Sequence, residues 1–186
     1  MDVLQTIKTR RSTRKFKDMP VPENIIYEML EAARLAPSGG NAQAHIFGVV
    51  RDSVLRKQLA EAAGNQMWIA TAPVIFACCG DISWDIADCS EDDFGLHVNQ
   101  LRFGTDFVKY LQAYPDRKAC NKFCNNSNPL IPAEHIFLTA VSHGLSACFV
   151  GCLDVEKASE ILGLPEHISC LFLLPVGYSD EIINPC

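Results

Sequence analysis

Two long apolar runs constrain the fold of this chain more than any other feature. Residues 73–79 and 168–176 are apolar at most successive positions, so neither shows the polar alternation of a half-exposed strand. The first run is closed by Gly80 and Asp81, which favour a turn. We therefore expect two strands that are buried on both faces, and a shorter apolar run at 46–50 predicts a further buried strand.

Helices with one apolar face are expected before, between and after these strands. Asp2, then Asp52 or Ser53, and Asp154 stand where N-caps are needed, and Pro22 suits a first helical position. The expected helices begin after Asp2, at Pro22 (to about Leu35), at 52–53, within 94–114 with an uncertain break at Gly104, at Pro132 (ending at Gly144), and after Asp154 (to about Gly163). Residues 116–132 lack periodicity and predict a long loop, whereas 146–151 predict another strand.

Length and composition favour one domain over residues 1–186. The 186 residues are 48% hydrophobic, which is enough for one substantial core. No apolar stretch reaches the about 18 residues of a membrane span, and residues 1–20 carry charges where a signal peptide needs an apolar core. The nine cysteines lack the spacing of a disulfide framework. We expect a soluble, cytoplasmic protein without a membrane partner.

Positive charge is concentrated near the N-terminus of an otherwise acidic chain. The net charge is −6, which argues against nucleic acid as a partner, yet residues 8–17 hold six of the 16 lysines and arginines. These six are Lys8, Arg10, Arg11, Arg14, Lys15 and Lys17. They are compatible with an anion-binding site, or with a solvated helix end whose cations lie near its negative pole. The charge count alone leaves both interpretations open.

Other kinds of chemistry find little support in the sequence. The pairs Cys120/Cys124 and Cys148/Cys152 do not match a zinc or iron–sulfur pattern, so no metal site is predicted. None of the five histidines has a Ser, Cys or Asp partner at a hydrolase spacing. Neither a dinucleotide-binding nor a P-loop glycine pattern occurs.

Three separated elements together resemble the nitroreductase family. They are Arg10-Arg11-Ser12-x-Arg14-x-Phe16, the turn-rich octet Ala36-Pro37-Ser38-Gly39-Gly40-Asn41-Ala42-Gln43, and Gly144-Leu145-Ser146-Ala147-Cys148-Phe149-Val150-Gly151. They occur in the family's order, and residues 174–178 resemble its last core strand. The resemblance implies an α+β three-layer sandwich, with a central mixed or antiparallel sheet flanked by helices. It also implies a homodimer with FMN at the interface, and a variable lid segment at about 82–130.

The residue types in these elements suit FMN. Arg10 and Arg11 can bind the phosphate, Ser12 can reach the ribityl or pyrimidine side, and Arg14 can stabilise the N1–C2=O edge, which gains negative charge on reduction. The remaining expected cofactor-binding residues are Pro37, Ser38, Gly39, Asn41 and Gln43 in the octet, and Cys148, Phe149, Val150 and Gly151 in the third element. The resemblance places the backbone amides of Val150 and Gly151 opposite flavin N5 and O4.

The resemblance implies a ping-pong oxidoreductase in which NADH or NADPH delivers hydride to the flavin and an electron-poor nitroaromatic or quinone then accepts it. No acid–base side chain is required, because the flavin supplies the chemistry. Three alternatives remain open. The first is a specialised flavoenzyme such as a reductive dehalogenase or a flavin-destroying enzyme; the second is a flavin-binding or sensor module with little turnover. The third is an anion- or nucleic-acid-binding protein that uses only the basic residues.

One departure from the family pattern concerns the C-terminal region. Many members place a basic residue there against the phosphate, whereas Lys157 is the last lysine or arginine of this sequence. The sequence ends at Cys186, so the arm that commonly wraps the partner subunit is expected to be short or missing. We expect weaker retention of FMN for these reasons.

Overall fold

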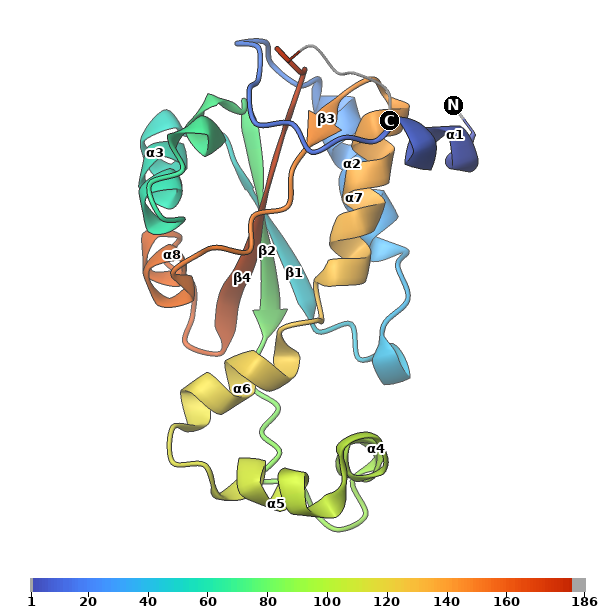
Figure 1. Cartoon of the computed structure of the whole chain (residues 1–186), viewed down its shortest axis with the longest axis vertical. Coiled ribbons are helices and arrows are strands. Elements are labelled where there is room, and N and C mark those ends of the chain that lie inside the picture. The colour runs from blue at the N-terminus through green and yellow to red at the C-terminus, as the bar shows by residue number, and fades with distance from the viewer. Residues whose placement is uncertain (1, 182–186) are drawn as a thin grey trace.

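The computed structural model describes residues 2–181 of the chain (Figure 1). The strands of this part are β1 (His45–Val50), β2 (Val74–Asp81), β3 (Ser146–Ala147) and β4 (Ile168–Gly177). Its α-helices are α1 (Val3–Thr9), α2 (Glu23–Arg34), α3 (Ser53–Ala62), α4 (Phe94–Phe103), α5 (Thr105–Ala113), α6 (Arg117–Asn125), α7 (Leu130–Ser142) and α8 (Val155–Ile161). Two 3₁₀ turns, η1 (Gly39–Asn41) and η2 (Met67–Thr71), lie in the connections.

The sheet has the strand order β1-β2-β4-β3, and its named strands pair antiparallel throughout. The central strands β2 and β4 are buried along nearly their whole length, which confirms the two strands expected from the apolar runs. A β-bulge shifts the register between Cys78 and Cys79. The strand expected at 46–50 also forms, but it lies at the sheet edge and Ile46 is 44% exposed. The expectation that this strand is buried was therefore wrong.

Helices cover both faces of the sheet. In Figure 1, α2 and α7 lie on one side and α3 and α8 on the other. Successive β2 residues serve the two layers: Phe76 packs in the cluster with Met29 and Phe137, whereas Ile75 packs in the cluster with Leu59. This division follows from the two-residue side-chain period of a strand. The expected three-layer α+β sandwich is confirmed.

Local caps explain where several helices begin. The carboxylates of Asp2, Asp52 and Asp154 accept hydrogen bonds from backbone N–H groups in the first turns of α1, α3 and α8. Each of these helix starts agrees with the sequence-based prediction. Helix α2 begins at Glu23 with Pro22 as its N-cap, one residue later than expected.

Helices α4, α5 and α6 extend beyond one end of the sheet, at the bottom of Figure 1. They share a small core of their own, formed by Ile86, Leu96, Val108 and Cys120. The expected break at Gly104 is confirmed, and this glycine adopts φ 87°, which side-chain-bearing residues rarely adopt. No helix among residues 2–181 is long and apolar enough to cross a membrane.

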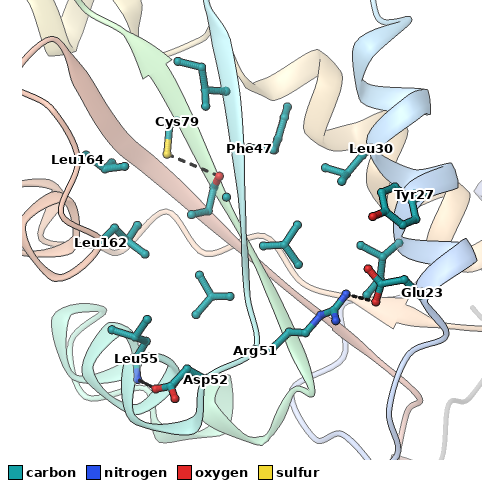
Figure 2. A pocket seen from close by; sticks show the side chains of 16 residues that line it. Glu23, Tyr27, Leu30, Phe47, Arg51, Asp52, Leu55, Cys79, Leu162 and Leu164 are labelled. Atoms are coloured by element: carbon teal, nitrogen blue, oxygen red, sulfur yellow. Dashed lines mark hydrogen bonds and ion pairs between the residues drawn. The ribbon is translucent and has the colours of Figure 1, made fainter.

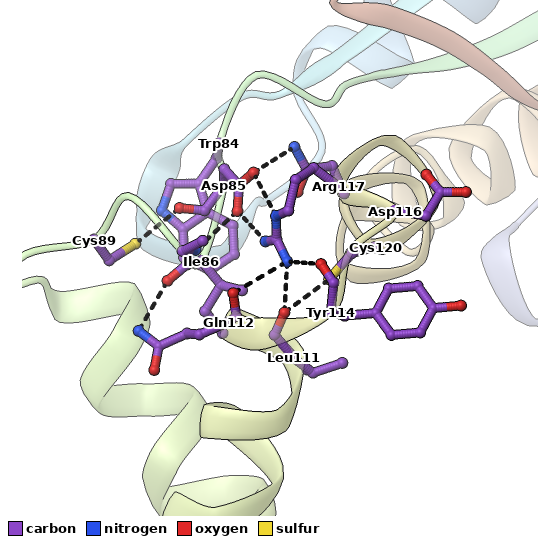
Figure 3. A network of polar contacts seen from close by, with 12 residues as sticks. Trp84, Asp85, Ile86, Cys89, Leu111, Gln112, Tyr114, Asp116, Arg117 and Cys120 are labelled. Atoms are coloured by element: carbon purple, nitrogen blue, oxygen red, sulfur yellow. Dashed lines mark hydrogen bonds and ion pairs between the residues drawn. The ribbon is translucent and has the colours of Figure 1, made fainter.

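The long loop expected at 116–132 was wrong, because helix α6 occupies Arg117–Asn125. The Asp116 carboxylate accepts from the Ala119 N–H at the start of this helix. Arg117 donates to both carboxylate oxygens of Asp85, and to the carbonyls of Leu111 (2.6 Å) and Tyr114 (3.0 Å), as Figure 3 shows. These partners lie outside α6, in other parts of the 82–130 segment. Contacts of this kind leave no periodic pattern in the sequence of the helix, and the helix was therefore not predicted.

Two further boundaries differ from the prediction. Helix α7 begins at Leu130, so Pro132 lies in its first turn instead of opening it, where a missing N–H is still tolerated. The strand expected over 146–151 is limited to Ser146–Ala147, followed by one isolated bridge from Val150 to Leu173. The chain therefore leaves the sheet between these two contacts.

Candidate functional site

The basic N-terminal segment lies along the β3 edge of the sheet. Ser12 forms a parallel bridge with Ala147, and the Thr13 N–H donates to the Ala147 carbonyl at 3.1 Å. Further along, buried Phe16 forms an antiparallel bridge with Ser179. Two bridges and a buried ring thus fix a segment that belongs to no helix or long strand. As a result, the motif at residues 10–16 lies next to the motif at residues 144–151.

Arg10 ends helix α1 and extends over the aromatic face of Phe137. Its Cζ atom lies 5.3 Å from the ring centroid, within the range of a cation–π contact. In residues 2–181 the Arg10 guanidinium has no hydrogen-bond acceptor. Its N–H groups are therefore available to an external anion.

Arg11 is engaged differently from what the sequence suggested. Its Nη1 donates to the carbonyls of Lys8 (2.9 Å) and Arg10 (2.7 Å), at the C-terminal end of α1. A cation at the C-terminal end of a helix is one of the two interpretations of the basic cluster that the charge count allowed, and it accounts for Arg11. The Arg11 Nε is buried, however, and has no acceptor in the described part of the chain. One donor of this side chain is therefore left unsatisfied.

The buried thiol of Cys148 lies within electrostatic reach of the N-terminal basic segment. Burial and the Glu181 carboxylate raise the pKa of this thiol, whereas Arg14, Ser12 and Arg10 lower it. The bridge from Ser12 to Ala147 likewise brings the N-terminal segment to the start of the 148–151 segment. Two of the three predicted elements therefore meet within one chain.

Of the two backbone amides expected to face a ligand, those of Val150 and Gly151, only one lacks an acceptor among the described residues. The Val150 N–H donates to the Leu173 carbonyl at 2.9 Å, and the Leu173 N–H donates back at 3.1 Å. The Val150 amide is thus already engaged, which corrects its expected role as a donor to a ligand. Gly151 is exposed, and its N–H donates to no acceptor within residues 2–181.

The octet at 36–43 lies far from the other two elements. Figure 1 shows η1 near the lower end of the α2/α7 layer, whereas α1 and the segment after it lie at the upper end. Asn41 and Gln43 adopt φ 55° and 52°, left-handed values that are uncommon outside glycine. The Gln43 N–H donates to the Ser38 hydroxyl at 3.0 Å, and the Gln43 side-chain amide donates to the Asn41 carbonyl oxygen at 3.2 Å. One chain alone does not bring Pro37, Ser38, Gly39, Asn41 and Gln43 to Arg10.

Two residues beside Arg10 were missed as site residues. Phe137 lies on the buried face of α7 and is 1% exposed. Burial raises the pKa of the half-buried carboxyl of Glu134, while Arg10 and His135 lower it in part. No spacing in the sequence links residue 10 to this turn of α7, so the contact depends on the tertiary fold.

A groove of about 710 Å³ lies along the edge strand β1, between α2 on one side and α3 and α8 on the other (Figure 2). Its lining is mostly apolar and includes Leu30, Phe47 and Leu55. The cation in it, Arg51, is paired with Glu23. None of the predicted site residues lines this groove, and its cation is already paired with a carboxylate.

The chain is similar to known proteins in both sequence and structure. The model of the nitroreductase family matches residues 7–178. An NADH dehydrogenase of Thermus thermophilus is 29% identical over 97% of this chain and 88% of its own length. An FMN reductase [NAD(P)H] of Bacillus subtilis is 34% identical over 95% of this chain and 66% of its own length. The solved structure of a nitroreductase family protein from Streptococcus pneumoniae matches with TM-score 0.73 and 25% identity, over 100% of this chain and 94% of that one. The chain thus belongs to the nitroreductase family.

Proposed function

We propose that this protein is an NAD(P)H-dependent FMN oxidoreductase that reduces electron-poor acceptors of the nitroaromatic or quinone class. The observation on which the proposal rests is a set of donors without acceptors on the two segments that adjoin β3, residues 10–12 and 148–151. It comprises the Arg10 guanidinium, the buried Arg11 Nε and the Gly151 N–H. Relatives named FMN reductase and NADPH-flavin oxidoreductase support the same activity.

The donor set fits FMN chemically. A buried N–H without an acceptor is costly, so the orphaned Arg11 Nε favours a bound acceptor such as a phosphate oxygen. Arg10 and Arg11 would hold the phosphate, with Arg10 the principal anchor because Arg11 also closes its own helix. When bound, FMN would supply hydride transfer between the nicotinamide donor and the acceptor.

The remaining residues would orient the ring and tune its charge. Arg14 would face the edge that becomes anionic on reduction, since it already lies near Cys148 and its side chain is exposed. The Gly151 N–H would donate to the N5/O4 side, and Ser12 to the ribityl or pyrimidine side. Donor and acceptor would use the same open face in turn, which predicts ping-pong kinetics.

A complete site would need two copies of the chain. Most of residues 36–43 are exposed, and they lie at the far end of the layer from Arg10, so they would serve the site of a second copy. Helix α1 also exposes three apolar side chains, Val3 (72%), Leu4 (59%) and Ile7 (50%), on a face that no described element covers. Such a patch is typical of a subunit interface. We therefore infer a homodimer with the flavin between its subunits.

The purified protein provides the first test. We expect flavin absorbance, FMN released on denaturation, and oxidation of NADH or NADPH with menadione or nitrofurazone as acceptor. Parallel lines in double-reciprocal plots would support the ping-pong order. A yellow protein that does not oxidise NAD(P)H would indicate a binding or sensor module. A preparation that stays colourless after incubation with FMN would contradict the proposal.

A further inference from the structure

The Arg10 guanidinium is oriented by a ring instead of by hydrogen bonds. It is half-buried, lies 5.3 Å from the Phe137 centroid, and donates to no acceptor within residues 2–181. A planar guanidinium stacks well on an aromatic face, and such contact leaves its N–H groups unused. The ring can therefore fix the direction of the side chain without competing for the donors that an anion needs.

Phe137 is itself rigidly held. It is 1% exposed, lies in the middle of α7, and packs in the core cluster on that face of the sheet. Its ring centroid is 5.7 Å from that of Phe149, at an interplanar angle of 54°. Phe149 belongs to the segment that ends in the free Gly151 amide. The two rings thus connect Arg10 at one end of the site with the 148–151 backbone at the other.

The neighbouring carboxylate does not provide an equivalent anchor. Glu134 lies one turn before Phe137 and is near enough to Arg10 for the two charges to interact. It nevertheless forms no ion pair with Arg10 within 4.0 Å. Among the described residues, the aromatic face is the contact that determines where the guanidinium points.

We propose that Phe137 is a positioning residue, whose ring holds Arg10 in the orientation that receives the FMN phosphate. This inference rests on the proposed function, since it takes Arg10 as the phosphate anchor. Its effect falls mainly on the phosphate, because the ring contacts Arg10 directly, whereas the 148–151 backbone is also held by the two hydrogen bonds between Val150 and Leu173. Loss of the ring should weaken the binding of FMN much more than that of riboflavin, which has the same ring system and no phosphate.

The test measures FMN and riboflavin affinity by flavin fluorescence quenching for wild type, Phe137→Leu, Arg10→Ala and the double variant. Phe137→Leu should weaken FMN binding by about five- to thirtyfold, the range of a desolvated cation–π contact, with riboflavin changed less than about twofold. Arg10→Ala should cost much less in the Phe137→Leu background than in wild type. Equal losses for FMN and riboflavin, or additive effects in the double variant, would overturn the proposal.

Two further variants separate positioning from packing. Phe76→Leu removes an equally buried ring from the same core cluster, away from Arg10, and should leave the ratio of FMN to riboflavin affinity unchanged. Arg10→Lys keeps the charge and loses the planar stacking group, so it should lower FMN affinity even if Phe137→Leu does not fold. An Arg10→Lys protein with wild-type FMN affinity would contradict the proposal. If wild type binds FMN no more tightly than riboflavin, or Arg10→Ala changes neither affinity, the phosphate assignment fails independently of Phe137.

Discussion

Glu134 shows how the surroundings of a single side chain can disfavour its charge. The half-buried carboxyl has a raised pKa, because burial disfavours its charged form more than Arg10 and His135 favour it. A carboxyl whose pKa is raised by folding contributes stability below its unfolded pKa, and this is lost as pH rises through the folded value. At neutral pH the charged Glu134 is therefore mildly destabilising.

Glu134→Gln should accordingly raise the free energy of unfolding of the flavin-free protein at pH 7. Because the group is partly exposed and screened, the gain should stay below about 1 kcal/mol, and it should vanish near pH 4. Urea unfolding at the two pH values measures it. Glu31→Gln is the control, because Arg34 lowers the pKa of the exposed Glu31, so neutralising that carboxyl should not stabilise. A loss of stability in Glu134→Gln at pH 7 would contradict the prediction.

Gly177, at the end of β4, should not tolerate a side chain. An added Cβ would lie 2.6 Å from Pro73 Cδ and 3.1 Å from Phe16 Cδ1, and neither ring can move away easily. Gly177→Ala should destabilise by about 1–3 kcal/mol through overpacking. Gly48→Ala is the matched strand control, because its Cβ would meet Ala77 at an ordinary 3.5 Å. Thermal unfolding of both variants tests the prediction, which fails if their transitions shift equally.

At this scale the sequence predicted local contacts and missed distant ones. The caps at Asp2, Asp52 and Asp154 were predicted because each partner lies within three residues. The engagement of the Val150 amide by Leu173, and the contact of Arg10 with Phe137, join residues far apart in the chain. No periodicity or spacing encodes such pairs.

At the scale of elements, the α4–α6 region shows where sequence periodicity fails. Helix α6 has few apolar positions, and contacts from other elements stabilise it. Lys118 and Lys122 pair with Glu156 of α8, and this lowers the pKa of Glu156 to about 2. Arg117 joins α6 to Asp85 and to the end of α5. The apolar central strands, by contrast, were predicted nearly residue by residue, because burial on both faces is visible in their composition.

Arg117→Met should loosen the 82–130 segment while leaving the sandwich folded. The Asp85 side chain is only 13% exposed, so its carboxylate would lose its main partner in a partly desolvated place. Limited proteolysis should cut within 82–130 several times faster than in wild type, with little change in the main unfolding transition. Arg102→Met is the control, since the partner described for this cation is the exposed ring of Phe103. Equal cleavage rates for the two variants would mean that Arg117 does not hold the segment.

At the scale of the molecule, the architecture followed from the sequence, but the arrangement of the site did not. Buried central strands and amphipathic helices agree with a three-layer sandwich, and the three motif elements agree with the family. The order of the motifs along one chain, however, does not determine whether a site is formed by one chain or by two. Because residues 36–43 lie far from Arg10 in one chain, the question is whether a site combines Arg10 of one copy with residues 36–43 of another.

Mixed dimers can answer it. If each site takes Arg10 from one chain and Asn41 from the other, Arg10→Ala and Asn41→Ala homodimers should both bind FMN weakly. In a mixed dimer, both defects fall in one site and the other site is intact. Equal mixtures that are unfolded and refolded together should then recover about a quarter of wild-type sites, counted by tightly bound FMN and by NAD(P)H oxidation.

The matching control mixes Arg10→Ala with Arg14→Ala chains. Both changes lie in the same element, so every site of this mixed dimer keeps one defect and no recovery is expected. Recovery in the first mixture alone would require a site shared between subunits. If neither mixture recovers, although each variant has refolded to a dimer by size-exclusion chromatography, Arg10 and Asn41 do not meet across the interface. The exposed octet would then need a role other than binding the flavin of a partner.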